Sequence, residues 1–360
     1  MIAQFTDSDG HTYRTQTELA RGGEGIILTV AGRTDVVVKR YLDGQATPER
    51  AAKLRAMLAD PPRDEMRERF KHASITWPLA ILHEGRRFAG FLMPRIDGGS
   101  SLLNAYNPRA REFLGLDWSG QHHVAKNLCT ALHALHLKGY VMGDVNQRNI
   151  LVTAQGLVTL VDTDSFQVRA GGTLYRCPVG VPEYTPRELQ GQRFDQVDRM
   201  PEHDRFGLAV LLFQLLMDGY HPFGGAPTNP DRSVGKVDEW CIRNGIFPWR
   251  PHPDFGKPRA ARPLEALAPG LRDLFVRCFV NGHAAPTLRP TPKEWLDALH
   301  AAQQALVRCA AGTHWCHPAG GPCHACQARQ RKSGAARAPN RTRTGPQART
   351  KRRRSDRHRR

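Results

Sequence analysis

The chain has 360 residues, of which 40% are hydrophobic and 24% are charged, and its formal net charge is +18. This composition is typical of a globular protein and excludes a chain that is disordered throughout. The longest apolar run, 206–217, is too short for a bilayer span and residues 1–10 lack signal-peptide features, which predicts a cytoplasmic protein with no membrane partner.

Short strands around one helix are predicted for the first hundred residues. β-Branched runs at 26–30 and 36–41 flank a Gly-Arg-Thr-Asp turn, which indicates a hairpin. Residues 48–59 carry apolar side chains at helical spacing. The runs 77–82 and 88–93 form a second strand pair around a Glu-Gly turn. The sequence therefore predicts a small β-rich lobe at this end of the chain.

Helices dominate from residue 121 onward, where only 149–152 and 157–161 look like strands. Apolar residues recur at three- and four-residue spacing in four segments, which predicts helices at 124–137, 204–217, 271–279 and 293–306. A sheet-rich lobe followed by a larger helical lobe is an α+β fold. The predicted boundaries are an N-lobe at 1–96, a C-lobe at 97–306, a cysteine-rich module at 307–327 and a tail at 328–360.

The basic charge is concentrated at the C-terminal end. Residues 327–360 carry 14 of the 52 Lys and Arg residues and one of the 34 acidic residues. The tail is otherwise rich in Gly, Pro, Ser and Thr, which predicts disorder. Two interpretations of it have equal support, a solvated solubilising segment and a contact with nucleic acid or another acidic partner.

A glycine-rich turn precedes a strand that ends in a single lysine. Gly22, Gly23 and Gly25 would let backbone N–H groups approach a phosphate closely. Lys39 ends the apolar run 36–38, and its compact charge suits phosphate oxygens. The two features in this order favour a phosphate site over a plain hairpin turn.

A longer pattern lies between residues 135 and 162. A helix end leads into a loop that carries Asp144 and, five residues later, Asn149, and an apolar strand follows. A second strand then ends at Asp162. In this order the landmarks resemble the catalytic loop and the metal-binding Asp of eukaryotic-type (Ser/Thr) protein kinases. A pair of Asp turns around a hairpin does not explain the order.

The resemblance covers about residues 15–306 and implies a bilobal protein-kinase-like fold, with a small β-rich N-lobe and a larger helical C-lobe. Residues 91–99 resemble the hinge between the lobes. There Met93 stands in the gatekeeper place, and the backbone N–H of Ile96 would face adenine.

Two further stretches of the helical region fit the same family. Residues 180–188 resemble the close of an activation segment, in which Glu188 would pair with Arg289. Asp204 begins a stretch that is similar to the family's central helix.

The chemistry that the resemblance implies is phosphoryl transfer from ATP. Lys39 would hold the α- and β-phosphates. Asp162 and Asn149 would bind Mg²⁺, which prefers oxygen ligands. Asp144 would orient the acceptor hydroxyl and take its proton.

The family also implies an acidic partner for Lys39 on the first helix. We predict Glu49 in this place, with Glu65 and Glu68 as alternatives.

Several residues depart from the family pattern, and three of them bear on function. Gly143 stands where an Arg would sense a phosphorylated activation segment, so we expect no regulation by that route. Asn146 replaces a Lys that helps to neutralise the γ-phosphate, which would cost rate. Asp164 places a second carboxylate after the metal-binding Asp, either as a second ligand or as a turn residue, and the turn role is favoured.

Four of the eight cysteines lie close together near the end of the chain. The predicted ligands of one tetrahedral zinc are Cys309, His314, Cys323 and Cys326, with Cys316 or His317 as substitutes. An exposed thiol-rich linker is the less favoured alternative. A kinase-like domain followed by such a module resembles a group of bacterial kinase-like proteins.

We therefore expect a serine/threonine protein kinase that uses ATP and Mg²⁺, carries zinc in its C-terminal module and acts on a protein substrate. The alternative is a pseudokinase scaffold that docks protein or nucleic acid through the zinc module and the basic tail. The retained residues Lys39, Asp144, Asn149 and Asp162 favour the enzyme. A small-molecule kinase is less favoured, because residues 180–188 resemble a peptide-docking segment.

Overall fold

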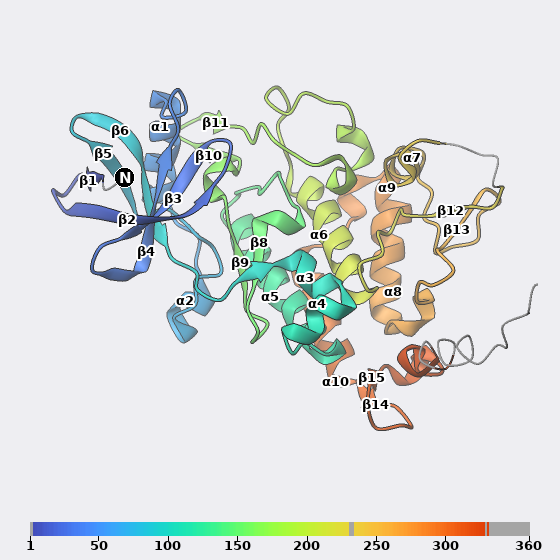
Figure 1. Cartoon of the computed structure of the whole chain (residues 1–360). Helices are drawn as coiled ribbons and strands as arrows, with labels where there is room; N and C mark the ends of the chain where they lie inside the picture. The colour runs from blue at the N-terminus through green and yellow to red at the C-terminus, as the bar shows by residue number, and fades with distance from the viewer. Residues whose placement is uncertain (1–2, 230–233, 328–329, 331–360) are drawn as a thin grey trace, which may run out of the picture. The chain divides into compact units, whose positions relative to one another are not determined.

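The computed structural model describes residues 3–229, 234–327 and 330 (Figure 1). The chain divides into a first unit, Met1–Gly321, and a second unit that begins at Pro322. Strands come first and helices dominate later in the first unit, so the prediction of an α+β fold is confirmed. None of the described helices is long and apolar enough to cross a membrane.

Six antiparallel strands close into a barrel in the order β1-β2-β3-β4-β6-β5. Apolar side chains from these strands, among them Phe5, Val38 and Leu92, form a core of their own. A side chain at Gly90 would clash with the Lys39 carbonyl oxygen on the neighbouring strand. The strands span Gln4–Thr6 (β1), Thr12–Arg21 (β2), Gly25–Val30 (β3), Arg33–Tyr41 (β4), Ala80–Glu84 (β5) and Arg87–Pro94 (β6).

Helix α1 (Pro48–Ala59) follows the barrel's fourth strand. Thr47 caps it, because its hydroxyl oxygen accepts a hydrogen bond of 3.2 Å from the Arg50 N–H. Leu54 and Met57 on its inner face join a hydrophobic core. Lys53 lies on the same buried face. The next helix, α2 (Glu65–Phe70), buries none of its residues.

The rest of the first unit is mainly helical. Its helices are α3 (Leu102–Tyr106), α4 (Pro108–Phe113), α5 (Trp118–Leu137), α6 (Pro201–Leu216), α7 (Val237–Asn244), α8 (Pro269–Val276), α9 (Gly282–Ala284) and α10 (Pro292–Gln304). A three-stranded sheet contains β7 (Ser100–Ser101), β8 (Ile150–Val152) and β9 (Val158–Leu160). Short strand pairs are β10 (Val168–Ala170) with β11 (Thr173–Tyr175), β12 (Ala226–Pro227) with β13 (Phe255–Gly256), and β14 (Val307–Arg308) with β15 (Trp315–Cys316).

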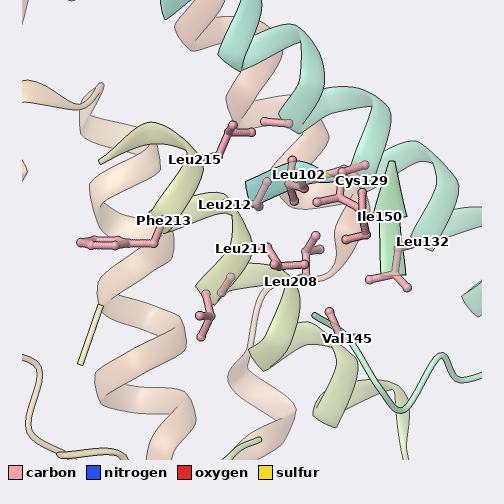
Figure 2. Packing of buried hydrophobic residues seen from close by; sticks show 14 of the residues in the cluster. Leu102, Cys129, Leu132, Val145, Ile150, Leu208, Leu211, Leu212, Phe213 and Leu215 are labelled. Atoms are coloured by element: carbon pink, nitrogen blue, oxygen red, sulfur yellow. The ribbon is translucent and has the colours of Figure 1, made fainter. Parts of the chain in front are cut away.

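Helix α6 is the centre of the large core (Figure 2). Its residues from Phe206 to Phe213 are all buried, as expected of a helix that is apolar on every side. In Figure 2 its leucines face Cys129 and Leu132 of α5 and Ile150 of β8. The core therefore fixes α6, α5 and the β8 strand relative to one another.

Most of the predicted elements are found with shifted ends. The helix predicted at 48–59 is confirmed with those bounds. The strand predicted at 77–82 begins only at Ala80, because Pro78 has no N–H to donate to a neighbouring strand. Strand β2 was not predicted, since most of its residues are polar and exposed. The predicted disordered tail, 328–360, lies outside the described residues except for Gln330.

Candidate active site

A cavity of about 1060 Å³ is lined by the turn between β2 and β3, by β4, by the segment after β6 and by the loops around Asp144 and Asp162. The predicted nucleotide-binding residues all line it, namely Gly22, Gly23, Gly25, Lys39, Met93 and Ile96. A Cβ at Gly25 would lie 2.8 Å from the Arg40 carbonyl oxygen, so packing requires glycine there. The space around Gly22 and Gly23 is open, which leaves their backbone accessible.

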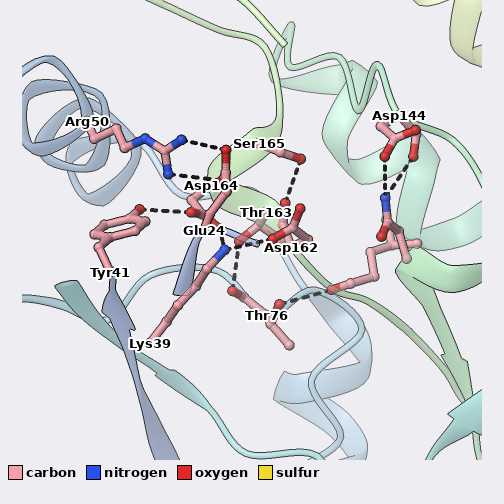
Figure 3. Close-up of polar contacts among 12 residues, drawn as sticks. Glu24, Lys39, Tyr41, Arg50, Thr76, Asp144, Asp162, Thr163, Asp164 and Ser165 are labelled. Atoms are coloured by element: carbon pink, nitrogen blue, oxygen red, sulfur yellow. Dashed lines mark hydrogen bonds and ion pairs between the residues drawn. The ribbon is translucent and has the colours of Figure 1, made fainter. Parts of the chain in front are cut away.

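The glycine-rich turn is attached to helix α1. Glu24 in this turn accepts two hydrogen bonds, of 2.9 and 2.6 Å, from the Arg50 guanidinium (Figure 3). Arg50 also lies over the Tyr41 ring, 5.0 Å from its centroid. These contacts hold the turn at one end of the cavity.

Another part of the cavity wall is formed where β6 ends. Met93 pairs with Val37 across the sheet, and the Arg95 N–H donates to the Asp35 carbonyl oxygen at 2.9 Å. Within the part of the chain that the structure describes, no hydrogen bond is made by the backbone N–H of Ile96. A main-chain donor on the cavity wall is thus left for a ligand.

Lys39 is buried at the inner end of the cavity, with 6% of its surface exposed. Its ammonium donates to Asp162 at 2.7 Å and to Asp164 at 2.5 Å (Figure 3). Burial lowers the pKa of Lys39, but the two carboxylates outweigh burial and raise the pKa overall. The predicted pairing of Lys39 with Glu49 is wrong, because Glu49 is exposed in the first turn of α1, and the inner face of α1 presents Lys53. The alternatives Glu65 and Glu68 lie on the exposed helix α2.

Asp164 is a buried ion-pair partner, so the favoured turn role is wrong. Its carboxylate accepts from Lys39 and, at 2.8 Å, from the Tyr41 hydroxyl. Its main-chain oxygen accepts from the Lys53 ammonium at 2.6 Å. Burial raises the pKa of Asp164, but the charge and hydrogen bond of Lys39 lower it overall. The carboxylate that neutralises Lys39 most closely therefore follows β9 in the chain and does not come from α1.

Asp162 has a backbone conformation that is rare for a non-glycine residue, with φ 59° and ψ 38°. Hydrogen bonds fix the residues after it, since Thr163 donates to the Thr76 carbonyl and Ser165 to the Asp162 carbonyl. The Asp162 side chain is 39% exposed although it contacts Lys39. Its carboxylate can therefore serve a ligand in the cavity.

Asp144 and Asn149 are brought together in the loop before β8. The Asn149 amide donates to the Asp144 carboxylate at 2.9 Å and to its main-chain oxygen at 3.1 Å (Figure 3). Asn146 donates to the same main-chain oxygen at 3.2 Å. The second carboxylate oxygen of Asp144 is buried without a hydrogen-bond partner among the described residues. Burial raises the pKa of Asp144.

The start of this loop is held by the first turn of α6. The carboxylate of Asp204, which is 1% exposed, accepts from the backbone N–H groups of Met142 at 2.7 Å and Gly143 at 2.8 Å. It also contacts His136 at 2.9 Å. The buried central helix thus fixes the backbone that carries Asp144.

Arg199 joins the same loop to the segment that precedes residue 180. Its guanidinium donates to the main-chain oxygens of Gly143 at 2.7 Å and Val179 at 2.9 Å. It lies 4.0 Å from the centroid of the Phe194 ring, and only 3% of its surface is exposed. No sequence motif identifies Arg199, because its partners are main-chain oxygens that lie at least 20 positions away in the chain.

Gly143 leaves space for the segment that Arg199 holds. It has φ 74°, and a Cβ there would lie 2.7 Å from the Cys177 Cβ and 2.8 Å from its Sγ. A side chain at this position would displace the segment that Arg199 holds.

Further along, the structure brings Glu188 and Arg289 together. The guanidinium of Arg289, with 1% of its surface exposed, binds both Glu188 carboxylate oxygens at 2.6 and 2.9 Å. It also donates to the main-chain oxygens of Gly282 and Glu202. This bidentate pair and the two main-chain hydrogen bonds fix residue 188 against α6 and the segment before α10.

The predicted zinc ligands come from both units of the chain. Cys309 and His314 lie on the β14–β15 hairpin, with 3.8 Å between Sγ and Nδ1. Cys323 and Cys326 belong to the second unit. Of the proposed substitutes, Cys316 donates to the Val307 carbonyl and His317 accepts from the Ala319 N–H.

Comparison with known proteins finds similarity over most of the chain. It is 33% identical over 327 residues to the protein kinase YegI of Escherichia coli (strain K12), a match that covers 88% of this chain and 49% of that protein. It is also 31% identical over 212 residues to the serine/threonine-protein kinase SBK2 of Homo sapiens, covering 56% of each. No protein-family model matches. The chain spans about half the length of the bacterial relative.

Proposed function

We propose that this chain, which contains a protein-kinase-like domain, transfers the γ-phosphoryl group of ATP to Ser or Thr hydroxyls of a protein. The observation that carries the proposal is the convergence of Lys39, Asp162 and Asp144 on one cavity beneath a glycine-rich turn. We assign the barrel and α1 to the smaller of two lobes and the helical remainder to the larger. The nucleotide would lie between them.

The residues of the cavity, together with Asn149 behind Asp144, fit a nucleotide with Mg²⁺. Asp162 offers an accessible carboxylate, and Asn149 turns its amide nitrogen to Asp144, which leaves an oxygen for a cation. Two oxygen donors are the kind of ligand that Mg²⁺ takes. Bound there, the ion would neutralise phosphate charge as the phosphoryl group is transferred. The free N–H of Ile96 would receive a hydrogen bond acceptor of adenine.

The roles of the side chains follow from their positions. Lys39 would bind the phosphates nearest the barrel, held in place by Asp164. The unpartnered oxygen of Asp144 would accept a hydrogen bond from the substrate hydroxyl and then its proton. The Asn149 and Asn146 amides hold the loop so that this oxygen stays in position.

Nucleotide binding is the direct test. ATP with Mg²⁺ at about 100 times its Kd should stabilise the folded protein by about 2.7 kcal/mol, seen as a rise in melting temperature. Lys39→Met should abolish that rise. Lys293→Met, which removes a lysine with an exposed partner on α10, should retain it. An absent shift in the wild type at saturating nucleotide would refute the proposed phosphate site.

Activity should not depend on phosphorylation of the activation segment. Arg199 already ties this segment to the catalytic loop through two main-chain oxygens, and Gly143 offers no guanidinium to a phosphate. Phosphatase-treated enzyme should therefore keep its rate of peptide phosphorylation, measured with radiolabelled ATP. Loss of that rate, with recovery after rephosphorylation within 165–185, would contradict the expectation.

The cysteine-rich region should contain about one zinc per chain, because the three thiols and one imidazole that the sequence groups there are the ligands of a tetrahedral zinc site. Elemental analysis of freshly purified protein measures this directly. Replacing Cys323 and Cys326 by Ser should remove the metal, whereas replacing the buried Cys241 of α7 by Ser should not. A zinc content near zero in protein kept from chelators and oxidants would leave a thiol-rich linker instead.

A further inference from the structure

Five cationic side chains line the cavity within the part of the chain that the structure describes: Lys39, Arg50, Lys53, Arg95 and Arg176. Four of them are paired with carboxylates. Lys39 pairs with Asp162 and Asp164, Arg50 with Glu24, Arg95 with Asp97 and Arg176 with Asp198. Lys53 differs from the others, since no carboxylate of the described residues lies within ion-pair distance of its ammonium.

The position of Lys53 is unfavourable for a cation without a ligand. It projects from the buried face of α1, and 7% of its surface is exposed. Its one hydrogen bond is the donation of 2.6 Å to the main-chain oxygen of Asp164. A buried ammonium has three donors and a high desolvation cost, which a single neutral acceptor does not offset. Burial accordingly lowers the pKa of Lys53, to about 8.

The place of Lys53 in the cavity indicates which ligand would pair with its ammonium. Asp164 contacts Lys39 through its carboxylate and Lys53 through its carbonyl, so both ammonium groups are bound to one residue of the cavity lining. Six carboxylates also line the cavity, namely Glu24, Glu49, Asp144, Asp162, Asp164 and Asp195. A polyphosphate entering such a site needs cations that are not already neutralised. Asn146 supplies none from the catalytic loop.

We propose that Lys53 is a second phosphate-binding residue, which contacts the polyphosphate of the nucleotide and supplies the charge that Asn146 does not. This inference rests on the proposed function, because it assigns a further ligand of the same nucleotide. The sequence predicted an acidic residue on α1 as the partner of Lys39. In the proposal α1 instead contributes a cation, and the chain after β9 contributes the carboxylate.

The experiment separates the charge of Lys53 from its support of Asp164. Lys53→Gln keeps an N–H donor for the Asp164 carbonyl but removes the charge, and Lys53→Arg keeps the charge. The matched control is Lys257→Met, because Lys257 also donates to a main-chain oxygen, that of Ala261 at 3.0 Å, and does not line the cavity. Calorimetry measures the affinity of each purified full-length variant for ATP with Mg²⁺ and for adenosine.

We expect Lys53→Gln to bind ATP at least tenfold more weakly than the wild type and to bind adenosine equally well. Lys53→Arg and Lys257→Met should stay within about threefold of the wild type for both ligands. Unchanged ATP affinity in Lys53→Gln, or an equal loss for ATP and adenosine, would overturn the inference and leave Lys53 a structural residue. Failure of the wild type to bind ATP would instead refute the proposed function.

A measurement on the wild type covers the case in which the variants do not fold. The rate of Lys53 acetylation by an amine-reactive reagent, followed by mass spectrometry, should fall at least fivefold with ATP and Mg²⁺. Adenosine should leave the rate unchanged, because it has no phosphate. Equal acetylation of Lys53 with and without ATP, in protein that binds ATP, would overturn the inference.

Discussion

Asp144→Asn should reduce peptide phosphorylation by at least 100-fold while the protein still binds ATP. The substitution keeps the size of the side chain but removes the proposed base for the hydroxyl proton, and general-base catalysis contributes about 10²- to 10⁴-fold. Asn149 can still contact the oxygen of the new amide, so the loop should keep its place. The measurement is the rate of phosphate transfer to a peptide library, together with the ATP-induced change in melting temperature.

Asp60→Asn is a suitable control for this result. Asp60 contacts Lys138 at the surface, and its side chain is 58% exposed. The control should retain the wild-type rate. A wild-type protein that binds ATP but transfers no phosphate, and is therefore indistinguishable from Asp144→Asn, would favour a pseudokinase.

Asp164→Asn should produce the largest loss of stability among single substitutions in the cavity, about 3 kcal/mol in the free energy of unfolding. Removing one partner of a buried ion pair leaves the other partner without its counter-charge, which typically costs about 3–5 kcal/mol. Here Lys39 retains Asp162, so we expect the lower end of that range. The Tyr41 hydroxyl also loses a charged acceptor.

Urea denaturation of the protein without nucleotide measures the effect. Asp297→Asn is the matched control, because Asp297 pairs with Lys293 on the exposed face of α10. Exposed pairs contribute about 0–1 kcal/mol, so the control should change the unfolding free energy by less than 1 kcal/mol. Equal effects of the two substitutions would mean that the Asp164 carboxylate does not stabilise the site.

The residues of the site that belong to local patterns could be predicted from the sequence. The turn with three glycines can be recognised from contiguous sequence alone. The same is true of an Asp that is followed five residues later by an Asn before a strand. The structure brings the glycines and Asp144 to one cavity, and Asn149 hydrogen-bonds to Asp144. Their proposed roles remain to be tested by the variants described above.

The ion pairs around Lys39 could not be predicted in the same way. Lys53 lies in a helix whose sequence also carries Arg50 and Arg55. Nothing in the local sequence shows which of these three cationic residues is buried. Asp164 follows Asp162 in a tight turn, and its burial depends on Tyr41 and Lys39, more than 120 positions earlier in the chain. Arg199 was missed for the same reason, because its acceptors are main-chain oxygens that carry no sequence signal.

The close packing at Gly143 has a consequence for engineering. An arginine could not be accommodated at this position by one substitution. The new Cβ would meet Cys177, the backbone has a left-handed conformation that side chains rarely adopt, and Arg199 already binds the Gly143 carbonyl oxygen. The arginine would need a smaller residue at 177 and a different residue at 199 beside it. A library of single substitutions should therefore not yield phosphorylation-dependent control, which would require several changes made together.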